Sequence, residues 1–156
     1  MGNSTIMKRK IRRKKRGPAR AKKVTFDGIK FASGLEKYMY IALKKAKIKA
    51  KYEGFTYTLQ EGFMCNIKSY ERQSNGKGDM VNRGRKKILP IKYTPDFVSD
   101  SFIIECKGRA NESFPMRWKM FKKYVKDNLK HVTLYEPQNQ KECDEVIKLI
   151  TKKKKR

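Results

Sequence analysis

Apolar residues recur at helical spacing in three stretches of the chain and alternate with polar residues between them. Leu35, Met39 and Leu43, for example, fall every four residues, which is the spacing of the buried face of an amphipathic helix. Alternation of apolar and polar residues over four to eight positions instead predicts a strand. In chain order, the expected elements are a hairpin at 24–31, a helix at 33–47, strands at 52–63, 88–98 and 102–107, a helix at 113–129, a strand at 131–135 and a helix at 140–151.

This order predicts a mixed α/β domain. After the first hairpin it is α-β-β-β-α-β with a C-terminal helix, so we expect an antiparallel hairpin or meander followed by a crossover strand. Ser33 and Glu36 have the spacing of a capping box and mark the start of the first helix. Residues 66–87 are polar, basic and rich in glycine, and we expect a loop or connector there.

Charge divides the chain into three parts. Lys and Arg total 41 against 15 Asp and Glu, a formal net charge of +26. Residues 1–23 contain eleven basic side chains and no acidic one, and residues 152–156 are all basic. We therefore expect a disordered N-terminal arm (1–23), a folded domain (24–151) and a basic C-terminal tail (152–156). Because the central domain is basic as well, nucleic acid is the expected partner.

Several classes of protein are disfavoured by the composition. No apolar stretch approaches the roughly 20 residues of a membrane span, so we expect no membrane partner. Cys65, Cys106 and Cys143 are widely spaced and odd in number, which favours a reducing compartment over a disulfide scaffold. A cytoplasmic location is the expectation, and the host cytoplasm if the gene belongs to a bacterial phage.

The candidate metal-binding and catalytic residues lie on either side of the short turn at Ser99 and Asp100. This turn brings Asp96 back alongside Glu105, with Lys107 on the same face of its strand as Glu105. Two neighbouring carboxylates repel each other unless a cation lies between them, and oxygen ligands suit Mg²⁺, with Mn²⁺ as a substitute. An ordinary surface hairpin with a Glu–Lys pair is the alternative. The Pro-Asp motif followed by eight residues and Glu-x-Lys makes the metal site the favoured interpretation.

Three motifs, in this order and at this spacing, resemble those of the PD-(D/E)XK nuclease superfamily. The closest likeness is to the endonuclease I type of Holliday-junction resolvase found in T7-like phages, and it extends over roughly residues 24–136. The motifs are Ser33-Gly34-Leu35-Glu36, Tyr93-Thr94-Pro95-Asp96-Phe97 and Ile103-Ile104-Glu105-Cys106-Lys107-Gly108.

The resemblance implies a restriction-endonuclease-like core and a role for each motif residue. Asp96 and Glu105 would bind Mg²⁺, with the backbone carbonyl of Cys106 as a further ligand. Lys107 would be the catalytic lysine, and Glu36 an additional acidic residue that is compatible with a second metal ion. A capping box explains Glu36 equally well, so both roles stay open for it.

The resemblance also implies a homodimer acting on branched DNA. In resolvases of this type two chains exchange parts of their fold, and the long connector at 61–92 is compatible with such an exchange. A two-fold dimer would present two sites to a four-way junction. After Gly108 the sequence departs from the family's pattern, which leaves the DNA contacts of the following helix open.

DNA contacts are expected to be electrostatic and directed at phosphates. The residues expected to make them are Lys14, Lys15, Arg16, Arg85, Lys86, Lys87, Arg109, Arg117, Lys122 and Lys123. The sequence thus favours a Mg²⁺-dependent, structure-selective DNA endonuclease, an enzyme of the phosphodiester hydrolase class. Two alternatives remain: a non-catalytic DNA-binding or packaging protein, and a related nicking or repair nuclease without junction preference.

Overall fold

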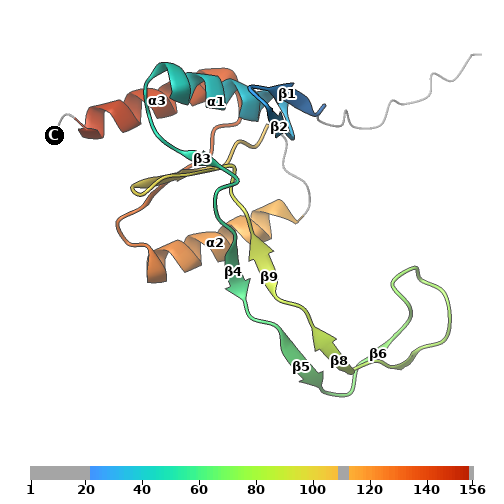
Figure 1. Cartoon of the computed structure of the whole chain (residues 1–156). Helices are drawn as coiled ribbons and strands as arrows, with labels where there is room; N and C mark the ends of the chain where they lie inside the picture. The colour runs from blue at the N-terminus through green and yellow to red at the C-terminus, as the bar shows by residue number, and fades with distance from the viewer. Residues whose placement is uncertain (1–21, 109–112, 155–156) are drawn as a thin grey trace, which may run out of the picture.

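The computed structural model describes residues 22–108 and 113–154, and it has a mixed α/β architecture with three helices in that part of the chain (Figure 1). This confirms the predicted fold class. The helices are α1 (Gly34–Lys45), α2 (Phe114–Asn128) and α3 (Gln140–Lys154). The strands are β1 (Val24–Phe26), β2 (Ile29–Phe31), β3 (Lys51–Tyr52), β4 (Tyr57–Gln60), β5 (Phe63–Asn66), β6 (Tyr70–Glu71), β7 (Val81–Asn82), β8 (Arg85–Ile88), β9 (Ile91–Tyr93), β10 (Phe97–Val98), β11 (Phe102–Ile104) and β12 (Thr133–Tyr135).

A four-stranded sheet forms the centre of the body, in the order β12-β11-β10-β3. β10 pairs with β11 and with β3 antiparallel, whereas β12 runs parallel to β11. The predicted tight turn joins β10 to β11, and the Ser99 amide donates to the Phe102 carbonyl at 2.9 Å. Since β11 and β12 are parallel, the chain crosses over between them, and α2 makes this crossover.

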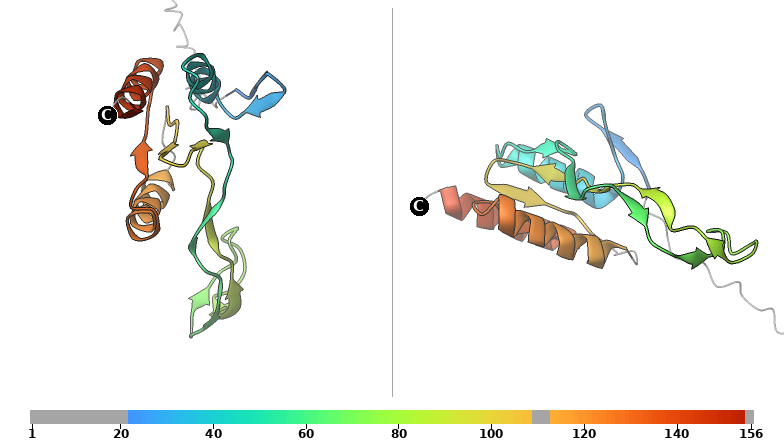
Figure 2. Two further views of the ribbon diagram at one scale, coloured as in Figure 1. Left: turned by 60° about the vertical axis from the view of Figure 1, so that its left-hand side comes forward. Right: turned by 90° about the horizontal axis from the view of Figure 1, so that it is seen from below.

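Two hydrophobic clusters cover the two faces of this sheet. Phe97 and Ile104 pack with the buried faces of α1 and α3, which also contact each other. Ile103 points the opposite way and packs with Trp118 and Phe121 of α2. Figure 2 shows the sheet between α2 and the α1–α3 pair. The sheet is therefore a buried layer, and the ends of its strands lie at the edge of two cores.

The strands predicted at 52–63 and 88–98 are not continuous, which corrects the sequence-based expectation. The first divides into β3, β4 and the start of β5, and Glu53 after β3 has a positive φ of 45°. Pro90 and Pro95 interrupt the second, because proline has no amide hydrogen for a ladder. Because of these breaks, β3 and β10 belong to the central sheet, whereas the neighbouring β4 and β9 pair with each other outside it.

The connector expected at 66–87 is instead part of a two-stranded projection. β5 pairs antiparallel with β8, and β6 with β7, so that the segment extends away from the body (Figure 1). We call residues 61–90, between β4 and β9, the β-arm. The segment does connect β4 to β9, but it is not a loop, because pairing between its strands supplies the regular structure although β-branched and aromatic residues are sparse.

The two ends of the chain also bear on the predicted domain limits. The tail expected from residue 152 is helical up to Lys154, consistent with the good helix propensity of lysine and its favourable position at a helix C-terminus. The N-terminal arm lies outside the described residues except for Lys22 and Lys23, which are exposed. None of the helices in residues 22–108 and 113–154 is long and apolar enough to cross a bilayer.

Candidate active site

Asp96 and Glu105 lie at the open end of the β10–β11 hairpin, opposite the tight turn. Asp96 precedes β10 and Glu105 follows β11, and the Asp96 Oδ2 atom accepts a hydrogen bond of 2.6 Å from the Cys106 amide. The backbone around both residues is fixed as well. The Glu53 amide donates to the Asp96 carbonyl at 2.8 Å, and the Glu105 amide donates to the Tyr135 carbonyl at 2.9 Å. The hairpin therefore brings the two predicted carboxylates together.

The side chains after β11 alternate as the sequence predicted. Cys106 is buried in the cluster that contains Ile104, and contact with the Cys143 sulfur raises the pKa of its thiol. Glu105 points to the other face, toward Tyr93 and Lys107. The Cys106 thiol thus belongs to the core, as expected, and only its backbone remains at the site.

Burial and mutual repulsion shift both carboxyl groups toward their protonated forms. Desolvation, followed by the charges of Glu105 and Glu36, raises the pKa of Asp96 from 3.8 to about 8. Desolvation likewise raises the pKa of Glu105, which is only 6% exposed. Buried carboxylates that repel each other are stable in the ionised form mainly when a cation lies beside them. Without a bound ion, both carboxyl groups are therefore biased toward the neutral form, and a cation beside them would favour the ionised form.

Two buried polar atoms at this site have no hydrogen-bond partner among the described residues. They are the Oε2 atom of Glu105 and the hydroxyl group of Tyr93. The two groups lie near each other: desolvation and then Glu105 raise the pKa of Tyr93, and Tyr93 in turn opposes the rise in the pKa of Glu105. Buried polar atoms almost always have a partner, and a small movement that pairs these two groups would satisfy them as well as a ligand, ion or water would.

Three basic side chains share a small cavity with Glu105, whereas Asp96 does not line that cavity. Glu105 and Lys107 line a cavity of about 290 Å³ together with Lys92 and Arg117. The Lys107 side chain extends over the ring of Phe114, with Nζ 4.8 Å from the ring centroid. This contact stabilises the lysine's charge through the ring's π electrons, and the lysine's charge in turn opposes the rise in the pKa of Glu105. The cavity is thus suited to an anionic group approaching the carboxylates.

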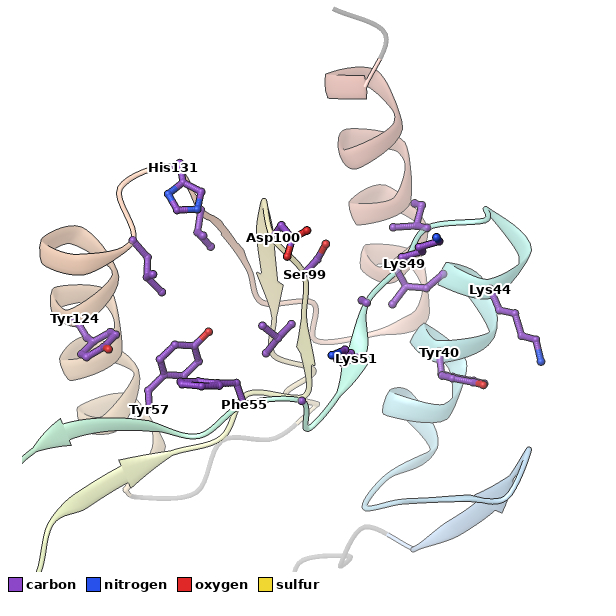
Figure 3. A pocket seen from close by; sticks show the side chains of 17 residues that line it. Tyr40, Lys44, Lys49, Lys51, Phe55, Tyr57, Ser99, Asp100, Tyr124 and His131 are labelled. Atoms are coloured by element: carbon purple, nitrogen blue, oxygen red, sulfur yellow. The ribbon is translucent and has the colours of Figure 1, made fainter.

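A larger cavity, of about 830 Å³, lies at the turn end of the same hairpin (Figure 3). Its lining includes Phe55, Tyr57 and Tyr124 on one side and Lys49 and Lys51 on the other (Figure 3). None of the predicted site residues lines it. The larger cavity and the predicted site residues therefore lie at opposite ends of the hairpin.

Glu36 makes the capping interactions that the sequence predicted. The Glu36 amide donates to the Ser33 hydroxyl at 3.2 Å, and that hydroxyl donates to Glu36 Oε1 at 2.7 Å. Glu36 Oε2 accepts hydrogen bonds from the Ala32 amide at 2.9 Å and from the Tyr52 hydroxyl at 2.7 Å. Glu36 nevertheless lies near enough to Asp96 in the same chain to contribute to its raised pKa. Capping and proximity to the site therefore coincide in one side chain.

Replacing Tyr52 with Phe measures how much the hydrogen bond from Tyr52 to Glu36 stabilises the fold. The substitution removes the 2.7 Å hydrogen bond to Glu36 and keeps the ring contacts with Phe31 and Phe97. We expect a loss of about 1–2 kcal/mol in the free energy of unfolding, because the acceptor is buried and charged. Urea denaturation measures it. Tyr40→Phe, which removes an exposed hydrogen bond to Asp27, serves as the control and should cost less than about 0.5 kcal/mol.

The donor set fits a magnesium ion better than a transition metal. The described residues contain no group of three or more His, Cys, Asp and Glu side chains placed to hold a metal ion. Magnesium, however, commonly takes only one or two carboxylates and completes its shell with water and phosphate oxygens. The unpartnered Glu105 oxygen and the raised pKa of Asp96 fit that pattern. The oxygens of Glu36 accept three hydrogen bonds, from Ser33, Ala32 and Tyr52, and its role as an additional acidic residue of the site stays a prediction.

The predicted DNA-contacting residues fall into separate places. Arg117 reaches the cavity at the carboxylates, whereas Lys122 and Lys123 are exposed along α2, and Lys123 pairs with Asp127 at 2.8 Å. The other predicted contacts that the structure describes, Arg85, Lys86 and Lys87, lie on β8 in the β-arm. Lys14, Lys15, Arg16 and Arg109 lie outside the described residues.

Tyr93, Tyr52 and Lys92 are the site residues that sequence reasoning assigned no role. Tyr93 is the first residue of the Tyr93-Thr94-Pro95-Asp96-Phe97 motif and Lys92 directly precedes it, so their position in the sequence was a usable signal. Tyr52 offered none, because only the pairing of β3 with β10 brings it near Glu36. Its contribution depends entirely on tertiary structure.

The fold and the site together define a mixed α/β protein in which a half-buried aspartate and a buried glutamate lie near a lysine at a hairpin end. The DUF1064 family, described as proteins of unknown function, has a model that matches residues 16–137. The chain belongs to this family. No curated protein and no solved structure matches the chain.

Proposed function

We propose that this protein is a Mg²⁺-dependent DNA endonuclease that selects branched DNA, as a Holliday-junction resolvase does. One observation carries the proposal: Asp96 and Glu105 are desolvated side by side, next to Lys107, and one Glu105 oxygen is without a partner. A surface ion pair would instead be solvated and satisfied. The pattern fits a site that binds a cation and the phosphate attached to it.

The arrangement of elements supports a restriction-endonuclease-like core. α1 precedes three antiparallel strands (β3, β10 and β11), and α2 then leads to β12, which is parallel to β11. Asp96, Glu105 and Lys107 lie at the ends of the two central strands. Active sites of α/β proteins commonly lie at strand ends, where backbone positions are rigid and side chains are accessible.

The residues of this chain would divide the work of phosphodiester hydrolysis among them. Asp96, Glu105 and the Cys106 carbonyl would hold Mg²⁺, which when bound supplies Lewis acidity toward a phosphate oxygen and a water molecule. Lys107 would orient a phosphate oxygen and offset the negative charge that develops during the reaction. Arg117 and Lys92, which line the same cavity, would hold the flanking backbone.

The proposal extends to shape recognition and to a homodimer. The high positive charge of the chain favours phosphate contacts, which carry no base information, so selection would depend on the shape of the DNA. A two-fold dimer would place two such sites on the symmetric strands of a four-way junction. As proposed, the reaction would take place in the cytoplasm, where branched DNA is processed.

The test compares a synthetic four-way junction with a linear duplex of the same sequence, in Mg²⁺ and in EDTA. We expect paired cuts near the branch point that require Mg²⁺, read from labelled strands on a denaturing gel. Equal cutting of both substrates would retain the nuclease and reject junction selectivity. Tight binding without cleavage in Mg²⁺ or Mn²⁺ would instead support a non-catalytic DNA-binding protein.

A further inference from the structure

The β-arm carries most of the exposed apolar surface of the described chain. Seven large apolar side chains on it are exposed, among them Met64 at 59%, Ile67 at 63% and Tyr70 at 61%. The arm also has seven basic residues against three acidic ones. Exposed apolar side chains are unfavourable in water and so indicate a partner, and the basic residues beside them indicate that this partner carries negative charge.

The register of β5 and β8 divides this surface into two different faces. Phe63 pairs with Ile88, Met64 with Lys87, Cys65 with Lys86 and Asn66 with Arg85. Paired residues lie on the same side of a ladder, and every second residue of a strand shares a side. One face therefore carries Met64, Asn66, Arg85 and Lys87, and we call it the Arg85–Lys87 face. The opposite face carries Lys86 with three less polar side chains.

Only the Arg85–Lys87 face has cations that are not already neutralised. Lys86, on the other face, forms an ion pair of 3.0 Å with Glu71. Within residues 22–108 and 113–154, neither Arg85 nor Lys87 forms an ion pair. Both are exposed, next to the exposed Met64. This face thus presents a net positive charge around an apolar centre.

Two partners would suit such a face, a second copy of the arm and duplex DNA, and the charge of the face distinguishes between them. A second copy of the arm would bring Arg85 and Lys87 against like charges, which repel when desolvated. Duplex DNA presents phosphates along both edges of a groove, with methyl groups and base edges on its floor. The face has cations and an apolar side chain side by side, which matches DNA and opposes self-association.

The dimensions of the arm agree with this choice. Two strands about 5 Å apart form a ribbon that the major groove, roughly 12 Å wide, accepts. The arm also begins at the proposed active site, since β9 ends at Tyr93 and β4 pairs with it. The extended segment from Tyr57 to Asn66 spans at most about 30 Å, close to one turn of duplex.

We propose that the Arg85–Lys87 face of the β-arm lies in the major groove of duplex DNA, about one helical turn from the phosphate held at the carboxylates. The second contact point, the phosphate held at the carboxylates, rests on the proposed function. It assigns a direction to the substrate: one duplex segment of a branched molecule runs from the carboxylates along the arm. The arm then measures a length of continuous duplex beside the cut.

The test measures DNA binding in EDTA, where no cleavage occurs, by fluorescence anisotropy with the full chain. Arg85→Ala/Lys87→Ala should raise the Kd for a junction with long arms about tenfold and reduce the salt dependence of log Kd by about 2. Lys45→Ala/Lys148→Ala, which removes the same charge from exposed positions on α1 and α3, should change the Kd less than about threefold. On a junction whose arms are shorter than about half a turn, the two double variants should bind alike.

Three results would overturn the inference. Equal losses for the two double variants, or a loss that does not depend on duplex length, would show that only general charge matters. A change in molar mass by light scattering, with DNA affinity intact, would show that the face binds a second copy. Binding is measured without Mg²⁺, so the binding result does not depend on cleavage. If the wild type fails to cleave DNA in Mg²⁺, the proposed function is rejected, but the binding data still test the inference about the β-arm. Thermal unfolding of each variant confirms that its body is folded.

Discussion

Replacing Asp96 with Asn is expected to stabilise the metal-free protein at pH 8 and to abolish its proposed activity. The pKa of Asp96 is raised to about 8 in the folded state, mainly by desolvation and by Glu105. Asn keeps an oxygen that accepts the Cys106 amide hydrogen and has no charge to bury. Cleavage of a junction in Mg²⁺ should fall roughly a thousandfold, since a charged ligand is lost.

The pH dependence follows from the direction of the shift. Below about pH 4 the carboxyl is protonated in both the folded and the unfolded chain, and its contribution is zero. As pH rises from about 4 to 8 only the unfolded chain releases the proton, so the free energy of unfolding falls through this window. Asn does not titrate. The variant should gain on the order of 3 kcal/mol at pH 8 and almost nothing at pH 4.

Differential scanning fluorimetry in EDTA from pH 4 to 8 measures this gain, which corresponds to about 5–10 °C in Tm. Asp100→Asn is the matched control, because Asp100 is exposed at the turn end of the same hairpin. It should leave the pH profile of Tm unchanged. A lower Tm for the Asp96 variant at pH 8 would show that its carboxylate stabilises the fold, and the cation-binding interpretation would fail.

Replacing Lys107 should reduce cleavage by a factor of about 10²–10⁴ and leave the fold intact. Lys107→Ala removes the ammonium group and the stem over Phe114, whereas Lys107→Met keeps most of the stem. With junction DNA at saturating concentration, we expect the cleavage rate to fall to a similar extent in both variants, because both remove the ammonium group of Lys107. Single-turnover kinetics in Mg²⁺ gives the rate of the chemical step.

Lys44→Met provides the comparison for a lysine held over an aromatic ring. Its Nζ lies 5.9 Å from the centroid of Tyr40 on α1, and it also pairs with Asp27. Cleavage by this variant should stay within about twofold of the wild type. Recovery of activity in Lys107→Met alone would mean that packing on Phe114, and not the charge, is what Lys107 contributes.

Local sequence determined the helices and the central hairpin. Helix spacing and the Ser33–Glu36 cap define α1, because both signals act within one turn of helix. The tight turn at Ser99 and Asp100 determines that Asp96 comes back beside Glu105, since two short strands joined by such a turn must pair. Alternation along β11 likewise separated Glu105 from Ile104 and Cys106.

The strands outside this hairpin were harder to predict. Residues 52–63 alternate like one strand, yet β3 joins the central sheet and β4 pairs with β9 outside it. The pattern of polar and apolar residues does not show where a strand changes partners, because both partners bury alternate residues. Similarly, the β-arm has a loop-like composition, and only pairing between β5 and β8 makes it a ribbon.

The sequence by itself determined which groups are present: two carboxylates, a lysine and an excess of basic residues, with the carboxylates close in the chain. The tertiary structure decided their chemical state. Packing of α2 and of the β12 connection removes water from Glu105, and the fold of α1 brings Glu36 near Asp96. Desolvation depends on every element that covers a residue, and most of those elements are distant in sequence.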